Sequence, residues 1–219
     1  MSRSKEDQII RETFRVKRRD TLPYTGWAAY AREDLAKLYN TLGYKVGAEI
    51  GVQGGRHARL MFQTIPDLKL FCVDPWKAYN RMKEHKIKIL YERCLKRLDG
   101  YNAEFMKMTS MEAVEKIPDG SLDFVYIDGL HEFDYVMMDI IRWSPKVRIG
   151  GIVAGHDYFK SYQVGVMPAV NAYTSAHGIH DWYVTTAYTP SRSQKKLELD
   201  ESPSFFWVQK KEYILDTGL

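Results

Sequence analysis

The sequence predicts an α/β fold in which helices cover both faces of a mostly parallel sheet. From residue 46 to residue 176, short apolar runs typical of buried strands alternate with segments of helical spacing. The chain then closes with two strand-like runs and no helix between them. Because strands joined by a loop tend to pair antiparallel, we expect seven strands with an antiparallel edge.

The composition is that of an ordinary globular chain with one sizeable core. The chain has 219 residues, of which 45% are hydrophobic and 27% charged, and its net charge is +4. No apolar run approaches the ~18 residues of a membrane span, and the first seven residues lack the core of a signal peptide. Cys72 and Cys94 stand alone, which indicates buried thiols in a reducing compartment. We therefore expect a cytoplasmic protein without membrane contact.

Residues 1–45 read as an N-terminal helical extension. Residues 3–19 carry seven Lys or Arg against three acids and favour a helix or a basic arm, with a solvated surface preferred over a binding arm. Residues 20–26 contain Pro23 and Gly26 and read as a break. Residues 27–42 repeat apolar side chains at helical spacing, and Gly43 is a plausible stop for that helix.

Residues 46–219 read as one domain of alternating elements. Strands are expected at 46–50, 68–73, 103–108, 122–127, 151–154, 182–186 and 205–208. Helices are expected at 56–65, 79–98, 110–116, 131–143 and 164–176. A polar loop, residues 189–203, separates the last two strands.

A glycine-rich turn follows the first of these strands. Gly51, Gly54 and Gly55 stand between the strand that ends at Glu49 and Ile50 and the next helix. Glycines allow close approach of backbone to a ligand, and a helix N-terminus offers free N–H groups. An ordinary strand–turn–helix is the alternative, because one glycine turn is a weak signal.

Polar side chains follow each of the first five strands. Asp74 comes 25 residues after Glu49, near the spacing at which an acid binds ribose hydroxyls. Any one such residue could simply cap a helix. Five in register indicate a ligand site at the carboxyl ends of the strands. The residues in question are Glu49, Asp74, Thr109 with Ser110, Asp128, and His156 with Asp157.

Three segments carry a resemblance to a known family. The run E-I-G-V-Q-G-G from Glu49 resembles the first motif of class I S-adenosylmethionine (SAM) methyltransferases, and it lacks the first glycine of a dehydrogenase motif. The runs I-D-G-L-H and G-G-I-V-A-G-H-D are similar to the IDGxH and GGxxxxHD signature of bacterial small-molecule O-methyltransferases. The resemblance covers residues 46–158. It implies a Rossmann-like class I methyltransferase fold and methyl transfer to a hydroxyl of a small molecule, glycan or secondary metabolite.

The resemblance also implies a role for each matching residue. Glu49, Gly51 and Gly54 would line the methionine end of SAM. Asp74 would hold the ribose, with Trp76 close by. Further along the chain, Thr109 or Ser110 would lie near the adenine, and Asp128 near the methionine or a metal.

Two devices could activate the acceptor hydroxyl. Mg²⁺ held by Asp128 and Asp157, with His156 as a further ligand, would lower the pKa of the hydroxyl. Alternatively His156 or His131 would act as general base, with Asp157 beside it. Related enzymes carry two acids where this chain has His156–Asp157, and histidine is a poorer Mg²⁺ ligand, so metal dependence stays open. Asp139 reads as a surface or supporting group.

Two further functions remain as alternatives. A nucleic-acid methyltransferase could use the basic helix at residues 81–97, which holds seven Lys or Arg. Against it, the fourth strand ends in Asp128-Gly129-Leu130-His131, where base N-methyltransferases have [DN]-P-P-[YFW]. A SAM-binding protein without catalysis is the other alternative. The sequence does not say whether the chain forms a homo-oligomer.

Overall fold

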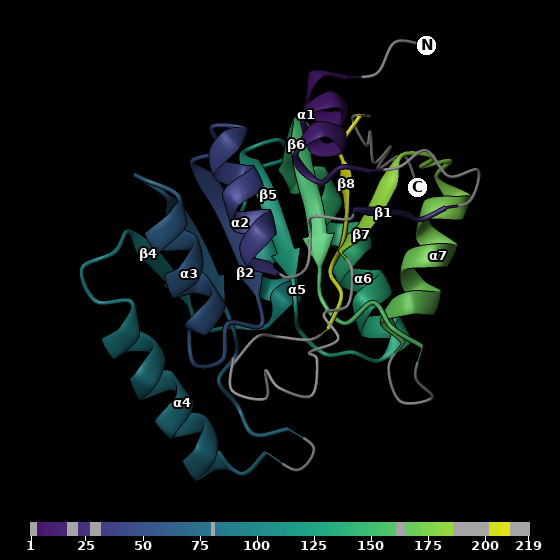
Figure 1. Ribbon diagram of the computed structural model, residues 1–219. Coiled ribbons are helices and arrows are strands. Elements are labelled where there is room, and N and C mark those ends of the chain that lie inside the picture. The colour runs from purple at the N-terminus through teal and green to yellow at the C-terminus, as the bar shows by residue number, and fades with distance from the viewer. Residues whose placement is uncertain are drawn as a thin grey trace, which may run out of the picture.

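The sheet is the centre of the computed structural model, which describes residues 4–16, 22–26, 32–79, 82–160, 165–185 and 202–210. Eight strands lie in the order β1-β7-β8-β6-β5-β2-β3-β4, with helices on both faces (Figure 1). The strands are β1 Tyr24–Gly26, β2 Val46–Ile50, β3 Lys69–Val73, β4 Ala103–Met106, β5 Leu122–Ile127, β6 Val147–Gly155, β7 Trp182–Thr185 and β8 Phe205–Val208. The helices are α1 Lys5–Thr13, α2 Arg32–Thr41, α3 Arg56–Thr64, α4 Glu84–Arg97, α5 Ser110–Val114, α6 Phe133–Trp143 and α7 Val166–Ala176, with a 3₁₀ turn, η1, at Ser144–Lys146.

The mostly parallel sheet expected from the sequence is confirmed, and all seven expected strands form. Strand β8 runs antiparallel to both of its neighbours, β6 and β7, so the antiparallel strand lies inside this end of the sheet. An eighth strand, β1, pairs parallel with β7 at the edge. Sequence reasoning interpreted this segment as a break because a three-residue strand beside Pro23 carries almost no alternation to detect.

Two hydrophobic cores sit on the two faces of the sheet. Alternate residues of β5 divide between them, because successive strand side chains point to opposite faces. Phe124 and Tyr126 join the core under α1, α2, α3 and α4. Val125 and Ile127 join the core under α5, α6 and α7. The same alternation turns Glu49, the register partner of Tyr126, toward the α3 face.

Several predicted boundaries shift or fall outside the described residues. The helix expected from residue 79 begins at Glu84, and β6 extends four residues earlier than expected, to Val147. The basic run 17–19, residues 27–31 and the loop 189–201 lie outside the described residues. Both cysteines are buried free thiols, as expected. No helix in the described part of the chain is long and apolar enough to cross a membrane.

The N-terminal extension packs against the sheet instead of standing apart from it. Ile10 and Phe14 are fully or almost fully buried in the core on the α3 face, and β1 is a strand of the sheet itself. Residues 5–13 are thus a packed helix. The division into an extension at 1–45 and a domain at 46–219 stays a prediction, with the qualification that the extension supplies a strand as well as helices.

Candidate active site

Three neighbouring strands end side by side at one edge of the sheet. Hydrogen bonds extend the ladder just beyond the strands: Asp128 N–H donates to Ile50 O at 2.8 Å, and His156 N–H donates to Ile127 O at 3.0 Å. The loops after β2, β5 and β6 therefore start from fixed positions. The side chains that follow these strands are brought together, as the sequence predicted.

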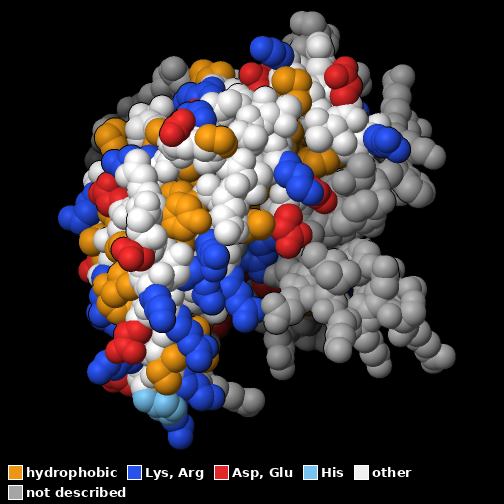
Figure 2. All heavy atoms as spheres, turned by 60° about the vertical axis from the view of Figure 1, so that its left-hand side comes forward, with side chains coloured by type: hydrophobic (Ala, Val, Ile, Leu, Met, Phe, Trp, Pro, Cys, Tyr) orange, Lys and Arg blue, Asp and Glu red, His pale blue; other side chains and the backbone are white. Residues whose placement is uncertain are grey.

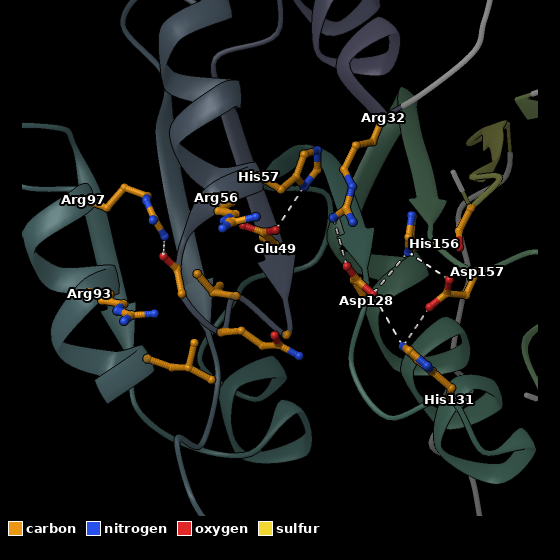
Figure 3. A pocket seen from close by; sticks show the side chains of 16 residues that line it. Arg32, Glu49, Arg56, His57, Arg93, Arg97, Asp128, His131, His156 and Asp157 are labelled. Atoms are coloured by element: carbon orange, nitrogen blue, oxygen red, sulfur yellow. Dashed lines mark hydrogen bonds and ion pairs between the residues drawn. The ribbon is translucent and has the colours of Figure 1, made fainter. Parts of the chain in front are cut away.

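Four titratable residues form what we call the rim cluster: Asp128, His131, His156 and Asp157. His131 Nε2 lies 3.2 Å from Asp157 Oδ2 and 3.5 Å from Asp128 Oδ1. His156 Nδ1 lies 3.3 Å from Asp157 Oδ1 and 3.7 Å from Asp128 Oδ1. Each imidazole thus bridges the same two carboxylates (Figure 3). The arrangement can accept, hold and pass on a proton.

The carboxylates perturb the proton affinity of the cluster. The hydrogen bond with Asp128 raises the pKa of His131 above its ordinary value, against the opposing effect of partial burial. Burial alone would raise the pKa of Asp157, but hydrogen bonds from His156 and Ser202 and both imidazole charges bring it to about 2. Asp157 therefore stays ionised at neutral pH, beside a histidine of increased basicity.

The backbone at Asp157 is in a conformation that L-residues seldom adopt. Its φ is +58°, in the left-handed region, and it is neither glycine nor asparagine. Gln53 and Trp76, with φ of +47° and +41°, are in the same region on neighbouring loops of this edge. Such residues cluster at functional sites, where the surrounding structure holds them in place.

An arginine from the N-terminal extension reaches the rim cluster. Arg32, the first residue of α2, pairs through NH1 with Asp128 Oδ2 at 3.1 Å. The Arg32 side chain is 18% exposed and that of Asp128 is 17% exposed. One carboxylate oxygen of Asp128 thus faces a guanidinium and the other faces the two histidines.

A second buried pair, Glu49 with His57, lies on the α3 side. Glu49 Oε1 is 3.0 Å from His57 Nδ1, and both side chains are almost completely buried. Burial, reinforced by Asp128, raises the pKa of Glu49, and burial, reinforced by Arg32, lowers the pKa of His57. Within the described residues, Glu49 Oε2 and His57 Nε2 have no hydrogen-bond partner. Two buried polar atoms thus remain for a ligand to satisfy.

Asp74 fixes the conformation of the glycine turn through hydrogen bonds. Asp74 Oδ2 accepts a hydrogen bond from Gln53 N at 2.8 Å, and Oδ1 accepts one from Trp76 N at 2.7 Å. Trp76 Nε1 in turn donates to Gln53 O at 2.9 Å. Gly51 has φ of +92°, and an added Cβ would lie 2.0 Å from Asp128 O. The turn therefore requires glycine at position 51.

One cavity of about 500 Å³ lies over the turn and beside the rim cluster. Seven residues predicted for the site line it, and four do not. Those that line it are Glu49, Gly51, Gly54, Asp128, His131, His156 and Asp157. Those outside its lining are Asp74, Trp76, Thr109 and Ser110.

Thr109 and Ser110 have structural partners. Thr109 caps α5 in a reciprocal capping box with Glu112. Ser110 Oγ accepts from Trp143 Nε1 at 2.7 Å and donates to Asp139 Oδ1. Asp139 is only 5% exposed, so it is a buried supporting group and not a surface residue. The adenine role predicted for Thr109 and Ser110 stays a prediction.

Sequence reasoning missed five titratable residues that line the cavity. They are Arg32, Arg56, His57, Arg93 and Arg97. Arg56 and His57 directly follow the glycine turn, so their position was a usable signal. Arg93 and Arg97 were interpreted as a solvated helix face, and nothing in the sequence connects Arg32 with Asp128, 96 residues away.

The rim cluster also contains a group suited to one metal ion. Asp128, His131 and Asp157 each offer one ligand atom, and these atoms lie within 4.8 Å of one another. Among the described residues this is the one group of that kind, and it uses His131 where the sequence suggested His156. Two carboxylates with an imidazole fit a divalent cation, and the nitrogen suits Mn²⁺ or Zn²⁺ better than Mg²⁺.

A comparison with known protein families agrees with this site. The site combines a glycine turn, acids at strand ends and a parallel sheet. A family model for a methyltransferase domain matches residues 48–158, which are 111 of the 219 residues. The chain belongs to this methyltransferase family. The matched segment contains the glycine turn, Asp74 and the whole rim cluster. Arg32 lies before it, in the extension.

Solved structures share the fold at low identity. The O-methyltransferase TomG from Streptomyces achromogenes, in complex with SAM, is 13% identical, with a TM-score of 0.57 over 95% of this chain and 91% of that one. An O-methyltransferase from Bacillus cereus, in complex with SAH, is 12% identical, with a TM-score of 0.58 over 95% and 92%. Such likeness establishes the Rossmann-like methyltransferase fold for this chain.

A curated relative matches a smaller part of the chain. The protein y4gI of Sinorhizobium fredii (strain NBRC 101917 / NGR234), described as uncharacterized, is 29% identical over 89 residues. The match covers 40% of this chain and 10% of that protein, so the chain corresponds to about a tenth of its relative's length.

Proposed function

We propose that this protein is a SAM-dependent O-methyltransferase that acts on a hydroxyl of a small molecule. The observation that carries the proposal is that the glycine turn and the rim cluster open into one cavity within a methyltransferase-family domain. The SAM and SAH complexes of the two O-methyltransferases named above support the choice of cofactor.

The methionine end of SAM would lie over the turn. Glu49 Oε2 is buried without a partner, and an ammonium group of the ligand would satisfy it. Gly51 lets the backbone approach the ligand closely, and Asp74 keeps the turn in shape. The ribose role predicted for Asp74 remains compatible with its geometry, since each carboxylate oxygen can accept a second hydrogen bond.

His131 is the best-supported general base. Its side chain is 39% exposed and lines the cavity, whereas His156 is 6% exposed. SAM supplies an activated methyl group on a sulfonium. The acceptor oxygen would bond to that methyl as the bond to sulfur breaks and the thioether of SAH is left, and the hydroxyl proton would pass to Nδ1 of His131, because Nε2 faces the two carboxylates. Asp128 and Asp157 stabilise the imidazolium that results.

A divalent cation on Asp128, His131 and Asp157 is the competing proposal for the same residues. When bound, such an ion would lower the pKa of the acceptor hydroxyl. His131 would then be a ligand, and His156, 3.3 Å from Asp157, would be the remaining base candidate. The donor set supports a transition-metal ion over Mg²⁺.

The finer assignments rest on the sequence resemblance. A glycan or secondary metabolite is the proposed acceptor class. The two free, buried thiols support a cytoplasmic location. Methylation of nucleic acid is not favoured, because Asp128-Gly129-Leu130-His131 stands where base N-methyltransferases have [DN]-P-P-[YFW]. Homo-oligomerisation stays an open prediction.

Titration calorimetry with SAM and SAH tests the proposal. The wild type should bind both at one site per chain. Glu49→Gln should weaken binding about tenfold, because it removes the negative charge from the group that accepts this hydrogen bond. Glu92→Gln, an exposed residue of α4, is the matched control. No heat of binding with the wild type would refute the cofactor assignment, and equal affinity for the two variants would refute the role of Glu49.

A further inference from the structure

Three arginines form one wall of the cavity, and we call them the arginine wall: Arg56, Arg93 and Arg97. Arg56 is the first residue of α3, and Arg93 and Arg97 lie one turn apart near the end of α4. All three line the cavity that also contains the rim cluster (Figure 3). Figure 2 shows Lys and Arg side chains gathered on the face that carries α4. The mechanism proposed above uses none of the three.

The arginine wall has no anionic partner within the described part of the chain. Among described residues, no carboxylate forms an ion pair with Arg56, Arg93 or Arg97, and Arg97 donates a hydrogen bond to Gly54 O. Arg32, across the same cavity, is paired with Asp128. Because three cationic side chains line one cavity, their positive charge would stabilise an anion bound there.

Backbone N–H groups at the start of α3 add to the positive electrostatic potential at the arginine wall. Helix α3 begins at Arg56, and its N-cap, Gly55, is in the left-handed conformation with φ of +71° and provides no side-chain cap. The first N–H groups of a helix without a cap are free to bind an anion. The cavity is therefore polarised, with acids at the rim cluster and guanidinium groups with helix N–H donors at the opposite wall.

We propose that the arginine wall is a binding site for a carboxylate or phosphate group of a ligand in this cavity. Guanidinium groups bind both anions through paired N–H donors. Two sources could supply the group: the carboxylate of the cofactor, or an anionic group on the acceptor. The choice between sources rests on the proposed function. The anion site itself does not.

The test uses Arg56→Gln and Arg93→Gln, both of which alter exposed side chains. Matched controls are Arg59→Gln on α3 and Lys96→Gln on α4, which are exposed and do not line the cavity. Titration calorimetry at low ionic strength measures binding of SAH, of 5′-methylthioadenosine, which lacks the carboxylate, and of inorganic pyrophosphate. Thermal unfolding checks that each variant is folded.

Two results support the proposal and identify the source. If the wall holds the cofactor, Arg93→Gln and Arg56→Gln weaken SAH about tenfold and leave 5′-methylthioadenosine within twofold. If it holds the acceptor, SAH affinity is unchanged, and pyrophosphate binds the SAH-saturated wild type but not these variants. Either affinity should fall as salt rises.

The proposal is overturned if the wall variants match Arg59→Gln and Lys96→Gln with all three probes. A wild type that binds neither SAH nor 5′-methylthioadenosine would refute the proposed function instead. Pyrophosphate titrated onto that same protein would still decide the anion site. Binding that Arg93→Gln abolishes would support it, and binding that is absent or insensitive to the substitution would refute it.

Discussion

Buried charges gather at both ends of the sheet, and the two groups differ in how completely they are paired. At the amino ends of the strands, Asp7 is fully buried and binds Lys210 Nζ at 2.6 Å and Tyr183 OH at 3.2 Å. Asp181 binds Arg11 at 3.2 Å and the same Lys210 at 3.1 Å. This amino-end network joins two acids to two bases and ties α1 to β7 and to the end of β8.

The rim cluster uses the same residue types and opens into a cavity. Its histidines share two carboxylates, Asp157 has a left-handed backbone, and Glu49 Oε2 beside it has no partner. Charges that are fully paired with one another hold a helix on the sheet. Charges that are incompletely paired and face a cavity can interact with a ligand. We infer that the amino-end network serves stability and the rim cluster serves chemistry, and substitutions at both ends can test this division.

The largest expected effect is on turnover at the rim cluster. His131→Gln should lower kcat for methyl transfer by about 10²- to 10⁴-fold, because it removes the proposed base. SAH affinity and the free energy of unfolding should stay close to wild type. His85→Gln, on the exposed face of α4, is the control. Full turnover in His131→Gln would shift the role of base to His156.

A buried acid near the site, Asp139, should give a pH-dependent stability. Burial, partly offset by the Ser110 hydrogen bond, raises its pKa from 3.8 to about 6. The stabilisation from its protonated form is therefore complete below about pH 4 and is lost as pH rises through about 6. Between pH 4 and 8 the wild type should lose about 3 kcal/mol relative to Asp139→Asn. Urea unfolding at each pH measures this difference.

Asp134→Asn provides the control for that experiment, because Asp134 lies on the exposed side of the same helix, α6. Its stability should follow the wild type at every pH. If the free energy of unfolding changed with pH in the same way for the wild type and Asp139→Asn, the assignment of a raised pKa to the buried carboxyl would be contradicted.

At the amino-end network, substitution should change stability and spare activity. Asp7→Asn should cost about 2 kcal/mol in the free energy of unfolding, since it leaves Lys210 with one partner. The cost stays below that of a fully buried pair because the Lys210 side chain is 42% exposed. Thermal unfolding measures it, with exposed Glu12→Gln as control. A fall in kcat without loss of stability would break the division between the two ends.

The smallest expected effect concerns metal affinity. If a cation binds Asp128, His131 and Asp157, the metal-free protein should bind Mn²⁺ more tightly than Mg²⁺, because the set includes an imidazole. Asp157→Asn should weaken Mn²⁺ about tenfold, and Asp119→Asn, an exposed acid outside the group, should not. Electron paramagnetic resonance of free Mn²⁺ measures both. Equal affinity for the two variants would favour the metal-free base.

The sequence predicted most of the fold because the signal is local. Each strand from β2 to β8 contains apolar residues that stand out from the neighbouring segments, and the glycine turn marks the first loop. Strand β1 was missed because its three residues contain no alternation, and it forms only by pairing with β7. Local periodicity cannot report a pairing between segments about 160 residues apart.

The site was predictable where strand ends alone determine position. Asp128, His156 and Asp157 meet because β5 and β6 are parallel neighbours, and that follows from the topology. Arg32 reaches Asp128 through the placement of α2, and Arg93 lines the cavity through the position of α4. Both depend on helix packing, which a single sequence does not encode in any short pattern.

The pairing of Arg32 with Asp128 also has a consequence for which part of the chain makes up the site. The family segment, residues 48–158, contributes the carboxylate, while the arginine comes from the N-terminal extension before it. A substitution at position 32 alone would remove the guanidinium that pairs with Asp128 and leave every residue of the family segment unchanged. The charge balance of the rim cluster therefore depends on a residue that lies outside the segment by which the family is defined.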